Sequence, residues 1–226
     1  HMGLKNTHHI GKIIVHPVDP QTIYVAAQGQ YYTDNIERGV YKSTNGGKNW
    51  KKIFGLMYNN QHIGVADLVM SPDNPDILYI SSYQRIRKPW GFSGAGPKSG
   101  IHKSIDGGKN WEKLSNGLPD GLLGKIGLAI YSKEPNIIYA IIEDANSPEL
   151  SFEDRWSEIL RGQSSSKPTK GNLVYMSDNS GANWIQVSEG NVGSRPNYYG
   201  QIIIDPNNHN ILYVLSEKVD ISIDGG

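Results

Sequence analysis

The feature that most constrains the fold of this chain is a short turn motif that recurs four times. Its clearest copy is SIDGGKNW, from Ser104 to Trp111, in which Asp106 and Gly107 can form a tight turn between two short strands. An Asp-Gly pair between short strands is the strongest local signal for a β-hairpin, because glycine adopts positive φ without a steric clash. The recurring positions are Ser43, Asn45, Gly47 and Trp50, then Ser104, Asp106, Gly108 and Trp111, then Ser177, Asn179, Gly181 and Trp184, and finally Ser222 and Asp224.

We interpret these positions as structural. The carboxylate of Asp106 can accept hydrogen bonds from the backbone N–H groups of its own turn, and Trp111 can lie over the turn as an apolar lid. Asn45 and Asn179 replace the aspartate in two copies, but an amide keeps a carbonyl oxygen that accepts the same bonds. The motif therefore predicts a fold and says little about chemistry.

A second repeat precedes each turn motif. It consists of an apolar strand, a turn rich in Pro and Asn, and a strand that contains a tyrosine, as in SPDNPDILY at 71–79. Each unit thus has four strands, here named A to D, with the turn motif between C and D. Repeated antiparallel meanders of four strands are the blades of a β-propeller. The tyrosines of strand B are Tyr24, Tyr79, Tyr139 and Tyr213.

The predicted fold class is therefore all-β, and the alternative is a β-sandwich with coincidental repeats. We expect one propeller segment over 1–226, with three complete blades and a partial fourth at about 10–55, 63–117, 125–189 and 198–226. Because such a set does not close an ordinary ring, we interpret the chain as a fragment of a larger propeller. Two copies that complete each other, or a missing strand supplied by residues 3–7, are alternatives. The incomplete fourth blade leaves a strand edge through which copies could self-associate.

Composition argues against several classes of function. With 22 basic and 22 acidic residues, the chain lacks the positive charge typical of nucleic-acid binding. No apolar run approaches the roughly 20 residues that span a bilayer, so no membrane insertion is expected. The absence of cysteine excludes disulfides. We expect no cofactor and no metal: the glycine-rich stretch 91–97 lacks a phosphate-loop pattern, and the adjacent His8 and His9 would point to opposite sides of a strand.

The strand order assigns the connections to two faces. The A–B and C–D turns lie on one face of the disc, and the B–C loops and D–A connections lie on the other. The long polar loops at 28–38, 84–99 and 143–171 all belong to the second face. The last has a helical insertion at 144–170, where SFEDRWSEILR predicts a short helix over 151–161 whose Trp156 packs rather than binds. Ligand binding is expected on this face, since loops on a rigid scaffold carry function.

Two groups of side chains are candidates for ligand binding. In the loop of the second blade, Arg85, Arg87 and Trp90 can stack on a sugar or bind a carboxylate; the alternative is that the cations only solvate the loop. On the inner strands, one column of the repeat contains polar residues at the mouth of the central channel, where Lys12 and Asp67 could also simply neutralise each other. The inner-strand candidates are Lys12, Asp67 and Gln201, together with His9 and Tyr198 three positions earlier in the column.

Together these motifs resemble the Asp-box, or bacterial neuraminidase, repeat of sialidases, xyloglucanase-type glycosidases and sortilin-type receptor domains. The chain looks most similar to sortilin-like or glycosyl hydrolase-like bacterial repeat proteins, which implies a secreted or periplasmic bacterial location. The resemblance implies a binding module with a glycan- or peptide-binding face. The alternative it implies is a glycoside hydrolase, or a fragment of one, with paired carboxylates. Candidates for such a pair are Asp67, Asp34 and Glu37, although no spacing in the sequence selects two of them.

Overall fold

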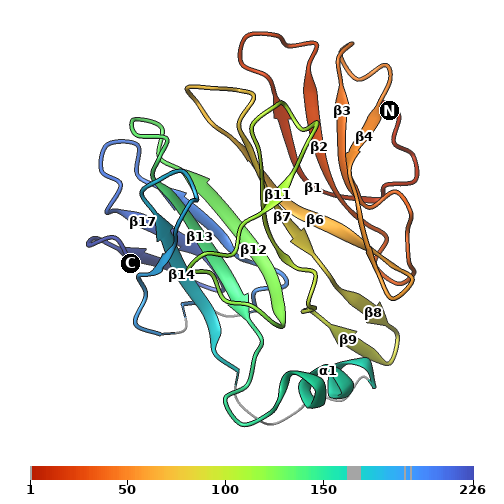
Figure 1. The fold of residues 1–226 in the computed structure, drawn as a ribbon, viewed down its shortest axis with the longest axis vertical. Coiled ribbons are helices and arrows are strands. Elements are labelled where there is room, and N and C mark those ends of the chain that lie inside the picture. Colours follow the sequence, from red (N-terminus) through yellow and green to blue (C-terminus); the bar gives the residue numbers. More distant parts are fainter. Residues whose placement is uncertain (1, 162–168, 191, 194) are drawn as a thin grey trace.

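A computed structural model describes residues 2–161, 169–190, 192–193 and 195–226. Nearly all regular elements of these residues are strands, which form successive antiparallel sheets (Figure 1). The first sheet is β1 (His9–Val15), β2 (Ile23–Gly29), β3 (Gly39–Ser43) and β4 (Lys51–Phe54). The second is β6 (Gln61–Met70), β7 (Leu78–Tyr83), β10 (Gly100–Ser104) and β11 (Glu112–Lys113), with β5 (Leu56–Tyr58) paired to the start of β6.

The third sheet is β12 (Leu123–Ile130), β13 (Ile138–Asp144), β14 (Gly171–Ser177) and β15 (Ile185–Gln186). The fourth is β16 (Gln201–Ile204), β17 (Leu212–Leu215) and β18 (Val219–Ser222). Each sheet is a meander in chain order, and the first strands of adjacent sheets lie against one another. The all-β class and the propeller arrangement of four blades predicted from the repeats are therefore confirmed.

The repeated tyrosines explain how one blade holds the next. Tyr24 donates from Oη to the carbonyl oxygen of Gly107 at 3.2 Å, and Tyr79 donates to that of Ser180 at 2.9 Å. Both acceptors lie in the C–D turn of the following blade. Two lysines of strand C donate to the same oxygens, Lys42 to Gly107 at 3.2 Å and Lys103 to Ser180 at 2.8 Å. Apolar clusters fill the blade junctions around these contacts.

The four C–D turns share a hydrogen bond in which the serine hydroxyl oxygen accepts the glycine N–H four residues later, as from Gly108 to Ser104 at 2.9 Å. In the first three turns the Asp or Asn oxygen also accepts from the residue four positions on, at 2.9 Å both for Asn110 to Asp106 and for Asn49 to Asn45. Asparagine thus makes the same turn as aspartate, which agrees with the structural interpretation of this position.

The predicted helix is α1 (Phe152–Leu160), capped by the Ser151 hydroxyl, which accepts from the N–H of Asp154 at 3.2 Å. It lies beside the ribbon of β8 (Ile86–Lys88) and β9 (Gly91–Ser93) (Figure 1). Trp156 packs on a small cluster formed by Ala95, Leu122 and Ala145. In the segments described here, no helix has the length and apolar character needed to cross a membrane.

Candidate functional site

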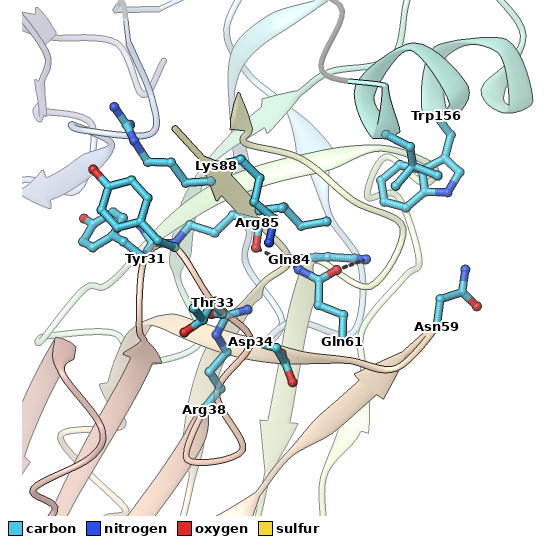
Figure 2. A pocket seen from close by; sticks show the side chains of 14 residues that line it. Tyr31, Thr33, Asp34, Arg38, Asn59, Gln61, Gln84, Arg85, Lys88 and Trp156 are labelled. Carbon is cyan, nitrogen blue, oxygen red and sulfur yellow. Dashed lines mark hydrogen bonds between the residues drawn. The ribbon is translucent and has the colours of Figure 1, made fainter. Parts of the chain in front are cut away.

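Two cavities lie on or below the face that carries the long loops, which we call the loop face. The loop-face cavity, of about 250 Å³, lies between the segment after β2, the start of β6, the β8–β9 ribbon and α1 (Figure 2). The channel cavity, of about 180 Å³, lies among the inner strands of all four blades. The loop-face cavity is lined by Tyr31, Tyr32, Thr33, Asp34, Arg38, Asn59, Gln61, Gln84, Arg85, Ile86, Arg87, Lys88, Trp156 and Leu160.

Arg38 shapes the loop that forms one wall of the loop-face cavity. Its guanidinium is buried and donates to three backbone carbonyl oxygens, those of His62 and Gln30 at 2.8 Å and that of Thr33 at 3.2 Å. Gly29 ends β2 at a φ of +77°, where a Cβ atom would lie 2.3 Å from Cγ of Arg38, so only glycine fits. The loop is therefore fixed by an internal arginine rather than left free.

Asp34 is engaged within the same wall. One carboxylate oxygen accepts the N–H of His62 at 2.8 Å, and the other contacts Nδ1 of the His62 ring. Burial alone would raise the pKa of Asp34, but the hydrogen bonds from His62 together bring it below its usual value. With 40% of its side chain exposed, Asp34 is an ionised group already paired with a neighbour. Its candidate partner Glu37 accepts from Asn35 Nδ2 at 2.8 Å and lines neither cavity.

Arg85 differs from Arg38 although both side chains line this cavity (Figure 2). It is 3% exposed, and its Nε and Nη2 have no hydrogen-bond partner among the described residues. The guanidinium lies over the ring of Tyr31 at 3.6 Å, and the His9 ring meets that tyrosine edge-on at 3.9 Å. The structure thus brings the predicted candidates His9 and Arg85 together around Tyr31.

The two other candidates of the second blade, Arg87 and Trp90, lie at different places on the β8–β9 ribbon. A hydrogen bond to Tyr198, with a smaller contribution from Tyr32, raises the pKa of Arg87 above its usual value. The side chains of Arg87, Tyr32 and Tyr198 therefore meet, although they come from three blades. Trp90 lies at the ribbon tip, 80% exposed, and faces a separate small groove. The structure places it outside the loop-face cavity.

Asp67, Lys12 and Gln201 line the channel cavity, as the inner-strand column predicted. Asp67 accepts two backbone N–H groups, that of Leu68 at 2.8 Å and that of Leu128 in the next blade at 3.0 Å. Burial raises its pKa. No ion pair joins it to Lys12 within the described part of the chain, so mutual neutralisation is not what occupies this carboxylate. Asp67 instead ties the second blade to the third.

Two charged residues near Asp67, Lys125 and Glu143, are not among the candidates predicted from the sequence. A bulge in β12 places Lys125 in the channel cavity, where its Nζ lies 3.4 Å from the carbonyl oxygen of Tyr198. Glu143 accepts the N–H of Lys125 at 3.2 Å, and burial raises its pKa to about 7. The sequence predicts a loop from residue 143 onward, whereas β13 continues through Glu143. The sequence signal for this position is Glu143 itself, a charged residue that directly follows the apolar run IYAII.

The cavities contain few carboxyl groups. Among the described residues that line them, Asp34 is the carboxylic acid of the loop-face cavity and Asp67 that of the channel cavity. The described residues also contain no group of three or more His, Asp or Glu side chains placed to bind a metal ion. What the loop-face cavity offers is aromatic rings, amides and cationic side chains.

Comparison with known proteins identifies similar folds. No protein-family profile and no curated protein matches the sequence. Among solved structures, a GH74 enzyme from Niastella koreensis aligns with a TM-score of 0.63 and 19% identity, over 96% of this chain and 30% of that chain. The GH74 xyloglucanase from Xanthomonas campestris gives a TM-score of 0.63 and 16% identity, over 96% and 28%. An ancestral GH74 enzyme gives 0.60 and 21%, over 96% and 23%.

These similarities establish the fold class alone, since all three identities are low. The chain spans less than a third of the length of each GH74 enzyme. Fold and site together define a β-propeller arrangement of four blades with a loop-face cavity.

Proposed function

We propose that the loop face binds carbohydrate in the loop-face cavity. The observation that carries this proposal is the lining of the cavity, where Tyr31, Tyr32 and Trp156 stand beside the amide of Asn59 and the cationic side chains of Arg87 and Lys88. Aromatic rings that stack on the apolar faces of a sugar, with a few polar groups that fix its hydroxyls, are the usual composition of a small-molecule pocket. The volume lies just below the range of about 300–1,000 Å³ typical of such pockets.

The position of the cavity supports the same function. It is formed by loops on a rigid scaffold, and Arg38 and Ser151 fix two of its walls through backbone hydrogen bonds. A preorganised cavity loses less free energy on binding than one that must be ordered by its ligand. The fold is shared with GH74 enzymes, one of them a xyloglucanase, which makes xyloglucan oligosaccharides the first ligands to test.

Isothermal titration calorimetry with neutral and charged oligosaccharides tests the proposal. We expect saturable binding to the native chain and at least about tenfold weaker binding to Tyr32→Ala, because stacking on an exposed ring is lost. Tyr199→Ala is the matched control, since Tyr199 is also exposed but lines neither cavity. Failure of every oligosaccharide to bind, or equal losses in the two variants, would contradict carbohydrate binding at this cavity.

Glycoside hydrolysis is the second candidate, and a specific observation favours it. Burial raises the pKa values of both Asp67 and Glu143, and a carboxylic acid that keeps its proton near neutral pH can act as a general acid. Against it, both oxygens of Asp67 already accept backbone N–H groups. Release of reducing ends from xyloglucan by the native chain, abolished in Glu143→Gln, would establish hydrolysis; absence of release would leave binding as the function.

A further inference from the structure

We propose that Arg85 is the anchor for a carboxylate on the bound glycan, so that the loop-face cavity selects oligosaccharides that contain uronic acids. This inference rests on the proposed carbohydrate-binding function. Arg85 is 3% exposed and lines the cavity, and two of its three guanidinium nitrogen atoms have no hydrogen-bond partner in the described residues. A buried polar group without a partner is costly and is expected where a ligand supplies the partner.

The charge of Arg85 is not neutralised by its surroundings. No described carboxylate pairs with it, and Asp34, the carboxylic acid of the cavity lining, is engaged by His62. Burial lowers the pKa values of His9 and Lys125, and the positive charge of Arg85 lowers both further. The positive charge of Arg85 thus acts on two separate side chains.

The rest of the lining adds to that potential. Arg87 and Lys88 line the cavity on the ribbon side, and Arg38 lies in the opposite wall. Both Nη atoms of Arg38 donate to backbone carbonyl oxygens, and its Nε is buried without a partner in the described residues, so Arg38 contributes mainly charge to the cavity. The cavity therefore attracts an anion through several cations and offers one guanidinium that can bind it directly.

Arg85 is held in place by its backbone and by stacking on Tyr31, so its guanidinium nitrogen atoms are not consumed. Its carbonyl oxygen accepts Nε2 of Gln61 at 2.8 Å, and Gln84 donates to the same Gln61 side chain at 3.2 Å. Gln84 is held in turn by Lys98, whose N–H donates to Oε1 at 3.0 Å. Tyr31 supports one face of the guanidinium. Such support orients the group before the ligand arrives, as a binding residue requires.

The planar fork of a guanidinium matches the two oxygens of a carboxylate, which can accept parallel hydrogen bonds. Uronic acids are sugars that carry such a group on a pyranose ring, and that ring can lie against the aromatic residues of the same cavity. Charge-assisted hydrogen bonds contribute about 1.5–3 kcal/mol each, which corresponds to at least about tenfold in affinity.

Calorimetry with matched ligand pairs tests the inference. The probes are oligomers of galacturonate, glucuronate and mannuronate, each measured beside its carboxyl-reduced neutral counterpart. We expect at least one uronate to bind about tenfold or more tightly than its neutral counterpart. Arg85→Gln should weaken that uronate at least about tenfold and change neutral binding less than about twofold, while Arg85→Lys, which keeps the charge but lacks the fork, should be intermediate.

Arg195→Gln is the matched control, because Arg195 is exposed and pairs with Glu217 at 2.7 Å outside both cavities. It should bind the uronate as the native chain does, and thermal melting should show that every variant is folded. If uronates and neutral sugars bind equally, or if Arg85→Gln binds both as well as the native chain, the anchor is refuted while carbohydrate binding stands. If no sugar of either kind binds, carbohydrate binding itself fails.

Discussion

The two faces of this propeller use polar groups in opposite ways. On the face of the C–D turns, each serine, aspartate or asparagine of the motif is fully engaged by its own turn, and Tyr24 and Tyr79 bind the turn of the next blade. On the loop face, Arg85 is buried with nitrogen atoms that bind nothing in the described chain. Side chains that complete their hydrogen bonds internally build the scaffold, whereas Arg85 lines the loop-face cavity with two nitrogen atoms left for a ligand.

Of the two arginines that line the loop-face cavity, Arg38 should have the larger effect on stability. Arg38 donates to three carbonyl oxygens, so Arg38→Gln leaves buried acceptors without a donor. We expect the free energy of unfolding to fall by about 3–5 kcal/mol, because hydrogen bonds to charged groups contribute about 1.5–3 kcal/mol each. Urea unfolding followed by circular dichroism measures the change. A loss below about 1 kcal/mol would show that Arg38 does not hold the loop.

Burial of Glu143 should make the free energy of unfolding depend on pH. The folded chain retains the proton of this residue up to about pH 7, whereas an unfolded chain releases it near 4.5, so ionisation opposes folding. The free energy of unfolding should therefore fall, by roughly 3 kcal/mol, as the pH rises between these values. In Glu143→Gln this component of the pH dependence should vanish. Parallel unfolding curves of the two proteins at both pH values would contradict the buried protonation.

In the turn motif, the serine hydroxyl should contribute more to stability than the charge of the aspartate. Ser104→Ala removes the buried hydroxyl that accepts the N–H of Gly108, and should lower the free energy of unfolding by about 1–3 kcal/mol. Asp106→Asn should leave the melting temperature close to that of the native chain, since Asn45 makes the same turn in the first blade. A destabilisation by Asp106→Asn as large as that by Ser104→Ala would show that the four turns are not equivalent.

The hydroxyl groups of the strand-B tyrosines should have the smallest effect on stability. Tyr79→Phe removes a hydrogen bond to the next blade and should cost about 1 kcal/mol. In Tyr139→Phe no cost of this kind is expected, because Oη of Tyr139 is buried without a partner in the described residues. Thermal melting of both variants checks the difference. Equal effects would mean that the hydroxyl at this repeat position does not hold adjacent blades together.

Much of the fold could be predicted from the sequence because it rests on local, repeated chemistry. The turn residues, the apolar inner strands and the helix cap at Ser151 each act within a few positions of the chain. The site could be predicted only in part. Arg85, His9 and Tyr198 were identified as candidates, but their neighbours Tyr31 and Tyr32 come from other segments, and no pattern in the sequence pairs them.

Lys125 and Glu143 were missed for a physical reason. The bulge that places Lys125 in the channel and the extension of β13 through Glu143 both depend on strand pairing, which residue type alone does not specify. Trp90 was selected for its chemistry and lies outside the loop-face cavity, because a hairpin carries it to the ribbon tip. Which residues share a cavity is decided by packing between blades.

The most direct test of the central claim is the free energy of unfolding of Arg85→Gln without any ligand, measured beside Arg38→Gln. If Arg85 is held for a ligand, removing its unpaired buried charge relieves a cost, and the variant should be at least as stable as the native chain. A loss of several kcal/mol, as expected for Arg38→Gln, would mean that Arg85 is a structural residue and would contradict its assignment as a ligand anchor.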